Sequence, residues 1–332
     1  MKNTNLNLPH SPSKVSESSF LVTGAAGFIG SNIVHELVRL KAKKIILLDN
    51  FSTGFQENIN EFLVESNVVF IEGDIRDIAT CSQACAGIDF VFHHAALGSI
   101  PRSIDTPLET NSVNVTGFLN MLNASRLANV KKFVFASSSS VYGDDSSKVK
   151  LEERIGRPIS PYAVTKTINE LYAEVFFRTY GMHTIGLRYF NVFGPKQNMN
   201  GPYAAVIPIF INHLLNGEKC LIYGDGKNTR DFTFVDNVVN AVIKAGLSNN
   251  SDSDGQVFNV ACGTCKSVNE LYWDIAKGLS VNFGPEYRDA RKGDILNSLA
   301  DIGKAKVEFG YEPIVSIEEG LRKTIEWYRN KK

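Results

Sequence analysis

The first half of the chain alternates short apolar runs with longer amphipathic stretches, and this alternation constrains the fold more than any other feature. The runs are four or five residues long, and apolar and polar residues do not alternate along them. This pattern is typical of strands that are buried on both faces of a sheet. They cover residues 20–23, 44–48, 68–71, 89–92, 132–135 and 184–187, and helical periodicity covers residues 28–40, 111–128 and 161–180. Strand, helix, strand in this order predicts an α/β fold built on a doubly wound parallel sheet.

The pattern loosens after about residue 190, where Gly-Pro pairs interrupt it. Beyond them we expect a helix over 204–216, strands over 220–223, 231–235 and 256–260, and helices starting at Asp236 and at Ser267. Residues 19–190 and about 230–262 are therefore predicted to form the larger domain. Residues from about 191–229 and 263–332 should form a smaller, discontinuous α/β lobe, and residues 1–18 a loose polar tail.

Composition excludes several classes of partner. The 332 residues carry 35 Lys and Arg against 35 Asp and Glu, and this balance argues against nucleic acid or a membrane surface as the main partner. Five cysteines and no apolar run at the N-terminus indicate free thiols in a reducing cytoplasm. We interpret the Cys262-x-x-Cys265 pair as structural and predict no metal site.

A glycine-rich turn follows the first apolar run. Gly24, Gly27 and Gly30 are three residues apart, which suits a tight turn, a close approach of the backbone to a pyrophosphate, and packing of the next helix on its strand. The next run ends at Asp49, where a carboxylate accepts hydrogen bonds from the adenine-ribose hydroxyls and repels a 2′-phosphate. Together they predict a Rossmann-type domain that binds NAD rather than NADP, with Asp74 near the adenine.

A second constellation carries chemistry. Tyr162 and Lys166 are four residues apart on a helix that Ser160 caps, so both side chains share one face. The lysine ammonium and the nicotinamide charge can lower the pKa of the tyrosine, whose free value near ~10 makes it a poor base. The serine run 137–140 ends the strand before it, where a hydroxyl can bridge Tyr162 and the substrate oxygen.

With further motifs, these residues resemble the extended short-chain dehydrogenase/reductase family over nearly the whole chain. The further motifs are His94-Ala95-Ala96, Asn114-Val115-Thr116-Gly117, Arg188-Tyr-Phe-Asn-Val-Phe-Gly-Pro195, Arg230-Asp231-Phe232 and Arg291-Lys292-Gly293-Asp294. The sequence is most similar to UDP-sugar 4-epimerases, in the branch that acts on UDP-N-acetylhexosamines or their uronic acids. The resemblance implies an enzyme with retained NAD that inverts carbon 4 through a 4-keto sugar, and a homodimer formed through a four-helix contact.

The resemblance also implies site residues. Tyr162 would be the base, Lys166 would hold the nicotinamide ribose, and Ser138 would be the hydroxyl partner. The cofactor would contact Gly24, Gly27, Phe28, Ile29, Gly30, Asp49, Asn50, Asp74, Ile75, Ala95, Ala96, Asn114, Tyr162, Lys166 and Tyr189. The UDP-sugar would contact Arg102, Ser103, Ser138, Ser139, Asn191, Gln197, Ala205, Val206, Tyr223, Arg230, Arg291, Asp294 and Ser298.

Substrate size is implied by Ser298, which matches the family position that gates the sugar pocket. A tyrosine there excludes N-acetylated sugars, whereas serine leaves room for them. We therefore expect UDP-N-acetylglucosamine and UDP-N-acetylgalactosamine as substrates, with UDP-glucose and UDP-galactose as slower ones.

Other functions remain open. A UDP-hexuronate 4-epimerase or decarboxylase is the nearest alternative, because Arg102 could meet a carboxylate. Related dehydratases and decarboxylases carry acids after the catalytic hydroxyl, where this chain has Ser139 and Ser140. A non-catalytic NAD-sensing protein is the alternative of another class, and the intact Tyr162 and Lys166 argue against it.

Overall fold

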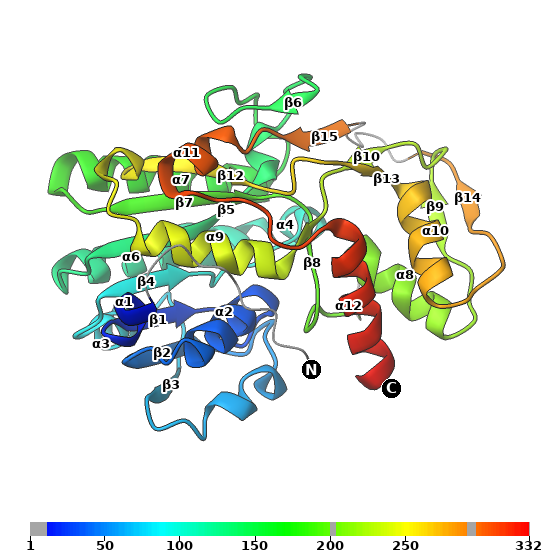
Figure 1. Ribbon diagram of the computed structural model, residues 1–332. Helices are drawn as coiled ribbons and strands as arrows, with labels where there is room; N and C mark the ends of the chain where they lie inside the picture. The colour runs from blue at the N-terminus through cyan, green and yellow to red at the C-terminus, as the bar shows by residue number, and fades with distance from the viewer. Residues whose placement is uncertain (1–11, 200–203, 291–296, 332) are drawn as a thin grey trace.

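The centre of the protein is a parallel β-sheet, seen in a computed structural model that describes residues 12–199, 204–290 and 297–331 (Figure 1). Within those residues its seven strands run in the order β12-β7-β5-β4-β1-β2-β3. They are β1 (Ser19–Thr23), β2 (Lys44–Asp49), β3 (Val68–Glu72), β4 (Phe90–His93), β5 (Lys132–Ser138), β7 (Thr184–Tyr189) and β12 (Gln256–Val260). All six pairings are parallel, which confirms the predicted doubly wound α/β fold.

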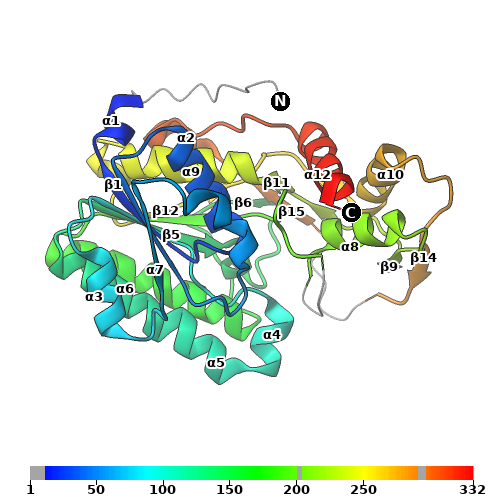
Figure 2. The same ribbon diagram turned by 90° about the horizontal axis from the view of Figure 1, so that it is seen from below.

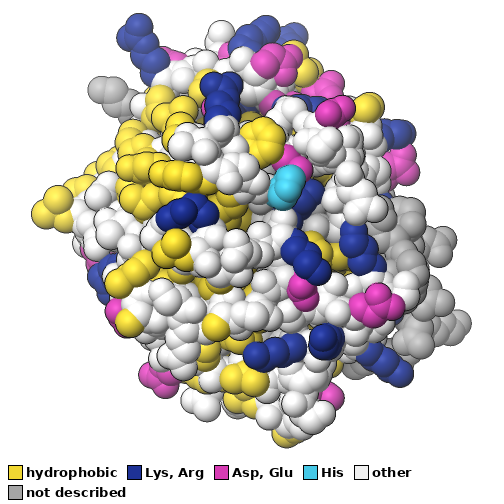
Figure 3. All heavy atoms as spheres, turned by 90° about the vertical axis from the view of Figure 1, so that its left-hand side faces the viewer, with side chains coloured by type: hydrophobic (Ala, Val, Ile, Leu, Met, Phe, Trp, Pro, Cys, Tyr) yellow, Lys and Arg dark blue, Asp and Glu magenta, His cyan; other side chains and the backbone are white. Residues whose placement is uncertain are grey.

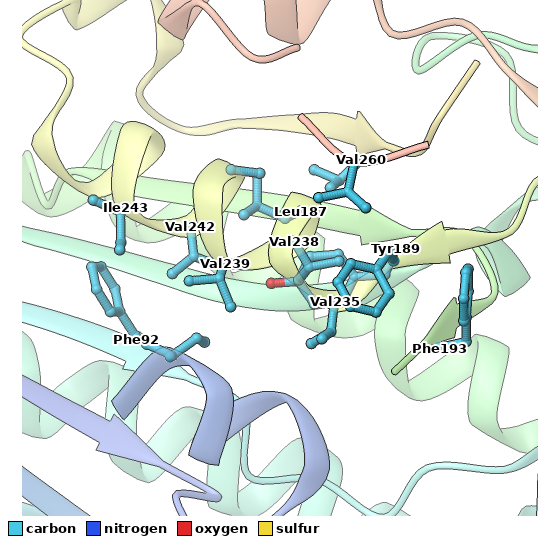
Figure 4. Packing of buried hydrophobic residues seen from close by; sticks show 14 of the residues in the cluster. Phe92, Leu187, Tyr189, Phe193, Val235, Val238, Val239, Val242, Ile243 and Val260 are labelled. Carbon is cyan, nitrogen blue, oxygen red and sulfur yellow. The ribbon is translucent and has the colours of Figure 1, made fainter. Parts of the chain in front are cut away.

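Helices cover both faces of this sheet, as Figure 2 shows from below. One face packs against α2 (Phe28–Arg39) and α9 (Val235–Leu247), and α11 (Gly303–Phe309) adds Phe309 against Phe258 of β12. The other face packs against α3 (Ile78–Cys85), α6 (Phe118–Leu127) and α7 (Pro161–Tyr180). Figure 4 shows the first of these interfaces, where valines of α9 face Phe92 and Leu187 of the sheet.

A smaller lobe is assembled from segments far apart in the sequence. Its helices are α8 (Val206–Leu215), α10 (Val268–Gly278) and α12 (Ile317–Lys331). A small sheet has the order β13 (Lys266–Ser267), β10 (Thr229–Arg230), β15 (Asn297–Ala300) and β6 (Val149–Lys150). Two further pairs are β9 (Leu221–Tyr223) with β14 (Glu286–Arg288), and β8 (Val192–Phe193) with β11 (Thr233–Phe234).

The remaining elements are short. They are α1 (Pro12–Ser16), α4 (Ile100–Asp105), α5 (Pro107–Asn111), the π-helical turn η3 (Ser112–Gly117), and the 3₁₀ turns η1 (Gln56–Asn58), η2 (Asn60–Phe62), η4 (Ser139–Tyr142) and η5 (Ser251–Ser253). No helix among the described residues is long and apolar enough to cross a membrane.

Three local predictions differ from the structure. The expected loose tail, residues 1–18, is ordered in its described part: α1 buries Val15, and Lys14 Nζ donates to the carbonyl of Leu247 at the C-terminus of α9 (2.6 Å). The expected strand 231–235 is reduced to the two residues of β11, and Val235 already begins α9. The expected helix 111–128 contains a π turn, where Gly117 lies so close to Ile75 that a Cβ would be 2.6 Å from it.

Candidate active site

A cavity of about 1020 Å³ opens at the carboxyl ends of the parallel strands. The chain leaves β1 toward β2 on one side and returns in β4 on the other, and ligands of doubly wound sheets bind at this switch point. The cavity extends from the glycine turn after β1, past the ends of β4 and β5, to β10 and β15 of the small lobe. One continuous space therefore joins the predicted cofactor and substrate residues.

The glycine turn after β1 is so tightly packed that Gly24 and Gly30 have no room for a side chain. Gly24 has φ +66°, and a Cβ there would lie 2.8 Å from the backbone of His94 and Ala95. A Cβ on Gly30 would lie 2.1 Å from the carbonyl oxygen of Gly24. Gly27 precedes α2 and lines the cavity, so the free amides at this helix N-terminus face a space suited to a phosphate group.

Asp49 ends β2 beside this turn and is buried. Its carboxylate accepts hydrogen bonds from the amides of Ala26 (2.9 Å) and Phe51 (2.8 Å), which fix its orientation. Burial raises the pKa of Asp49, and these amides counteract part of that effect. Asp74 lines the same end of the cavity, where Arg76 lowers the pKa of Asp74 to about 2.

Tyr162 and Lys166 both line the cavity from the first turns of α7. Ser160 caps this helix through the amide of Ala163 (3.1 Å), and Lys166 Nζ donates to the carbonyl of Ala136 at the end of β5 (2.8 Å). Ser138 Oγ accepts a hydrogen bond from the amide of Ser140 at 3.2 Å, and its hydroxyl is close enough to Tyr162 to act on the pKa of the phenol. That acceptor role leaves the Ser138 proton available to Tyr162 or to a substrate oxygen.

Burial governs the titration of this pair. It raises the pKa of Tyr162, and the hydrogen bond from Ser138 acts in the opposite direction. The expected lowering by Lys166 is not found: the removal of the phenol from water is the largest effect on the pKa of Tyr162, and Lys166 is not among its causes. Burial lowers the pKa of Lys166 to about 8, so its ammonium form predominates at pH 7 and is lost as the pH rises through about 8.

The two adjacent histidines have different surroundings. His93 is buried, and its Nδ1 lies 2.9 Å from Thr23 Oγ1. His94 lines the cavity, stacks on Tyr189 and is hydrogen-bonded to its hydroxyl at 2.8 Å. Burial lowers the pKa of His94 to about 3, so this ring is neutral and forms a fixed polar wall with Tyr189.

The other end of the cavity belongs to the small lobe. Ser298 of β15 lines it, next to Arg230 of β10, with which it is in register. Asn191 and Gln197 also line the cavity, and Asn191 Nδ2 donates to the carbonyl of Asp231 (3.0 Å). Residues 191–197 and residues 230–298 thus contribute to the same end of the cavity. A diphosphate and a sugar would lie there, next to the cofactor.

Not every predicted residue reaches the cavity wall. Asn114 is buried behind it and holds Leu97 and Thr165, and Ser103 donates to the carbonyl of Ile100 within α4. The predicted residues that do not line the cavity are Asn114, Arg102, Ser103, Ala205, Val206 and Tyr223. Arg291 and Asp294 lie outside the described residues.

The structure also adds residues that the sequence did not suggest. Ile100 and Ile104 of α4 line the cavity in place of Arg102 and Ser103, because residues four apart share a helix face. Lys150 of β6 lines it beside β15, with its ammonium paired to Asp145 at 2.9 Å. No motif surrounds Lys150, so only the pairing of β6 with β15 could identify it.

The residues present fit a dinucleotide. The glycine turn leaves room for a pyrophosphate, Asp49 presents a fixed carboxylate for a ribose, and Lys166 lies beyond them at the cavity wall. Among the described residues, no group of three His, Cys, Asp or Glu side chains is placed to hold a metal ion.

Comparisons with known proteins agree with this geometry. UDP-glucose 4-epimerase of Mycolicibacterium smegmatis is 38% identical over 94% of this chain and 98% of its own length. A solved UDP-N-acetylglucosamine 4-epimerase of Methanobrevibacter ruminantium, in complex with UDP-N-acetylmuramic acid, has a TM-score of 0.90, 40% identity and coverage of 95% and 99%. UDP-N-acetyl-alpha-D-glucosaminuronate decarboxylase of Bacillus cytotoxicus is 34% identical over 93% and 97% of the two chains.

The model of the NAD dependent epimerase/dehydratase family matches residues 20–261. This range contains the parallel sheet except Ser19, together with the cavity residues at the carboxyl ends of its strands. NAD is the cofactor of this family, as predicted, and the full-length relatives are enzymes of UDP-sugars. The chain belongs to the NAD dependent epimerase/dehydratase family, among its UDP-sugar 4-epimerases.

Proposed function

We propose that this protein inverts carbon 4 of UDP-N-acetylhexosamines, interconverting UDP-N-acetylglucosamine and UDP-N-acetylgalactosamine. NAD, held by the glycine turn, Asp49 and Lys166, would supply a reversible acceptor for the hydride of carbon 4, so that the sugar passes through a 4-keto form. The chain's own residues bind the UDP, position the 4-hydroxyl and move its proton.

Tyr162 is the proposed base that takes the proton of the 4-hydroxyl. The Ser138 hydroxyl, which lines the cavity together with Tyr162, holds the same oxygen in line. Lys166 adds a positive charge close to the phenol, with its ammonium 5.8 Å from the centre of the Tyr162 ring. Since burial raises the pKa of Tyr162, this charge supports the phenolate at neutral pH.

The residues after Ser138 favour epimerisation over elimination. Ser139 and Ser140 line the cavity in η4, where a dehydratase would need a carboxylic acid and its conjugate base. A serine hydroxyl ionises far above neutral pH, so it cannot replace a carboxyl group as general acid and base. Ser139 and Ser140 therefore provide no group that would remove the hydroxyl next to the keto carbon.

Ser298 is the single observation that carries the N-acetyl preference. It lies on the cavity wall, in register with Arg230, so a sugar whose diphosphate is held by Arg230 passes close to it. A small side chain there leaves space for an acetamido group.

The direct test is a screen of purified protein with UDP-N-acetylglucosamine, UDP-glucose and their uronic acids, following inversion at carbon 4 by NMR. Faster turnover of UDP-glucose than of UDP-N-acetylglucosamine would contradict the proposal.

A UDP-hexuronate 4-epimerase is the second candidate, and Lys150 is the observation that favours it. Its ammonium lies at the sugar end of the cavity, where it could meet a carboxylate. The ammonium is already paired with Asp145, which also accepts from it through its backbone carbonyl. The uronic acid arm of the same screen separates the two substrates.

We also propose that the protein is a homodimer through α5 and α7. Figure 3 shows hydrophobic side chains gathered along its left edge. This edge is the side of the molecule on which Figure 2 places α5 and α7. Leu108, Leu171 and Val175 expose 86%, 56% and 52% of their surface, and large apolar side chains gathered on one side of a protein are typical of a contact with another protein. Size-exclusion chromatography with light scattering should give twice the chain mass, and Leu171→Glu should give a monomer.

A further inference from the structure

A buried carboxylate lies one helical turn beyond Lys166 and has no part in the chemistry described so far. Glu170 is four residues after Lys166 on α7, so the two side chains share one face of the helix. Its carboxylate forms a two-pronged ion pair with Arg188 of β7, at 2.9 Å from Nε and 2.8 Å from Nη2. The two side chains expose only 10% and 3% of their surface, so the pair is shielded from solvent.

Glu170 also contacts β5, next to the catalytic hydroxyl. It accepts a hydrogen bond from Ser137 Oγ, while Lys166 donates to the carbonyl of Ala136. Lys166 and Glu170, one turn apart on α7, thus bind consecutive residues of β5, and Ser138 is the next residue of that strand. The same contacts that hold α7 on β5 therefore set the separation of Ser138, Tyr162 and Lys166.

The other side of the ion pair is equally fixed. Arg188 Nη1 donates to the hydroxyl of Tyr142 (3.1 Å) and to the carbonyl of Glu152 (2.9 Å). Tyr142 in turn donates to Asn259 Oδ1 at 2.6 Å. Arg188 thus uses all three of its nitrogens, and Glu170 cannot shift without breaking several buried bonds.

Stability alone does not account for such a pair. Replacing a buried ion pair by apolar side chains of similar volume is often neutral or stabilising, because both charges lose their hydration. A charge placed one turn from Lys166 has a separate effect, since burial lowers the pKa of Lys166 and the carboxylate of Glu170 is the neighbour that raises it. The arrangement therefore favours a role at the catalytic lysine.

We propose that Glu170, held by Arg188 and Ser137, is a positioning residue that keeps Lys166 protonated and fixed against the end of β5. This inference rests on the proposed function, since a protonated Lys166 matters only if Tyr162 must act as a base. Its first test needs no turnover.

The first test measures the reactivity of Lys166 directly. Competitive acetylation of the purified full-length protein with acetic anhydride, read by peptide mass spectrometry between pH 6 and 9, reports the neutral fraction of each amine. Lys131, whose side chain is 67% exposed, is the internal reference. Glu170→Gln should raise the acetylation of Lys166 relative to Lys131 about fivefold at pH 7, because a fall of about one unit from a pKa near 8 increases the neutral fraction by that factor.

Matched variants separate charge from structure. Glu174→Gln makes the same change one turn further along α7, where the carboxylate pairs with Arg178 and its side chain is 40% exposed, and should leave Lys166 unchanged. Glu170→Asp keeps the charge and should stay close to the parent. If Glu170→Gln does not fold, the double variant Glu170→Gln with Arg188→Met removes both charges and should still raise the reactivity of Lys166. Unchanged reactivity in the folded variant overturns the inference.

The second test is the pH profile of kcat. Turnover should fall as pH rises through about 8, where Lys166 loses its proton, and Glu170→Gln should move this alkaline limb about one pH unit lower. KM for the UDP-sugar should change less than about threefold, because Glu170 does not line the cavity. A parent protein without activity on any UDP-sugar refutes the proposed function, while the acetylation series still decides the role of Glu170.

Discussion

Ser298→Tyr is the change that most directly tests how the cavity selects its substrate. Ser298 is 8% exposed and lies on β15, whose backbone is held by register with β10 and by a hydrogen bond from the amide of Asp231 to the carbonyl of Ser298 (2.9 Å). The variant leaves these backbone contacts in place, so the strand should keep its position. A phenol ring then occupies space at the sugar end of the cavity.

The expected loss follows from the size of the excluded group. One extra methylene in a filled pocket is worth about 1–3 kcal/mol, or roughly 10–200-fold in kcat/KM. An acetamido group is larger than a methylene, so kcat/KM for UDP-N-acetylglucosamine should fall by at least ~100-fold. UDP-glucose has a hydroxyl at that position, and its kcat/KM should change less than about threefold.

The assay compares both substrates with three proteins: the parent, Ser298→Tyr and Ser298→Ala. The alanine variant removes the hydroxyl but keeps the space, so it should retain the N-acetyl activity. Inversion at carbon 4 is followed by NMR, with bound NAD and the melting temperature as controls for an intact site. If Ser298→Tyr epimerises UDP-N-acetylglucosamine at the parent rate, Ser298 does not limit the pocket and the proposed substrate loses its main support.

Three further changes test the remaining parts of the site. Tyr162→Phe should keep bound NAD but lower turnover by at least ~100-fold, the usual scale for a lost general base, and near-normal turnover would refute its role. Protein purified without added cofactor should release NAD on denaturation, and Asp49→Ala should lower the occupancy measured in the denatured supernatant; NADP as the main species would contradict the assignment of Asp49. Gly30→Ala places a Cβ 2.1 Å from the carbonyl of Gly24 and should lower both the melting temperature and the NAD content, whereas a variant with parental values would show that the turn can open.

The sequence predicts the cofactor half of the site because its determinants are local. Gly24, Gly27 and Gly30 lie within seven residues, and Asp49 follows at the end of the next strand. Backbone sterics alone require glycine at Gly24 and Gly30, and the structure confirms both the turn and the parallel sheet around it. Periodicity also places Tyr162 and Lys166 on one helix face, where the structure has them.

The substrate half is harder to predict because its walls come from strands of two to four residues. β6, β10 and β15 carry Lys150, Arg230 and Ser298, and each strand is too short to show a period. The titration of Tyr162 is equally non-local, since the burial that raises its pKa depends on the whole cavity. Glu170 and Arg188 are 18 residues apart and belong to a helix and a strand, so only their tertiary pairing shows that they act together.

The cofactor end of the cavity tolerates substitution less than the sugar end does. A substitution in the glycine turn clashes with backbone atoms, which cannot move without displacing β1 or α2. Ser298 and Lys150 instead present side chains to the cavity from adjacent strands, while backbone register holds the strands themselves. The Ser298 side chain can therefore vary at little cost to the sheet, whereas Lys150 is held by its ion pair with Asp145. Relatives that share the fold at 34–40% identity are accordingly named for different UDP-sugar reactions, and the small lobe is where this chain's own preference should be sought first.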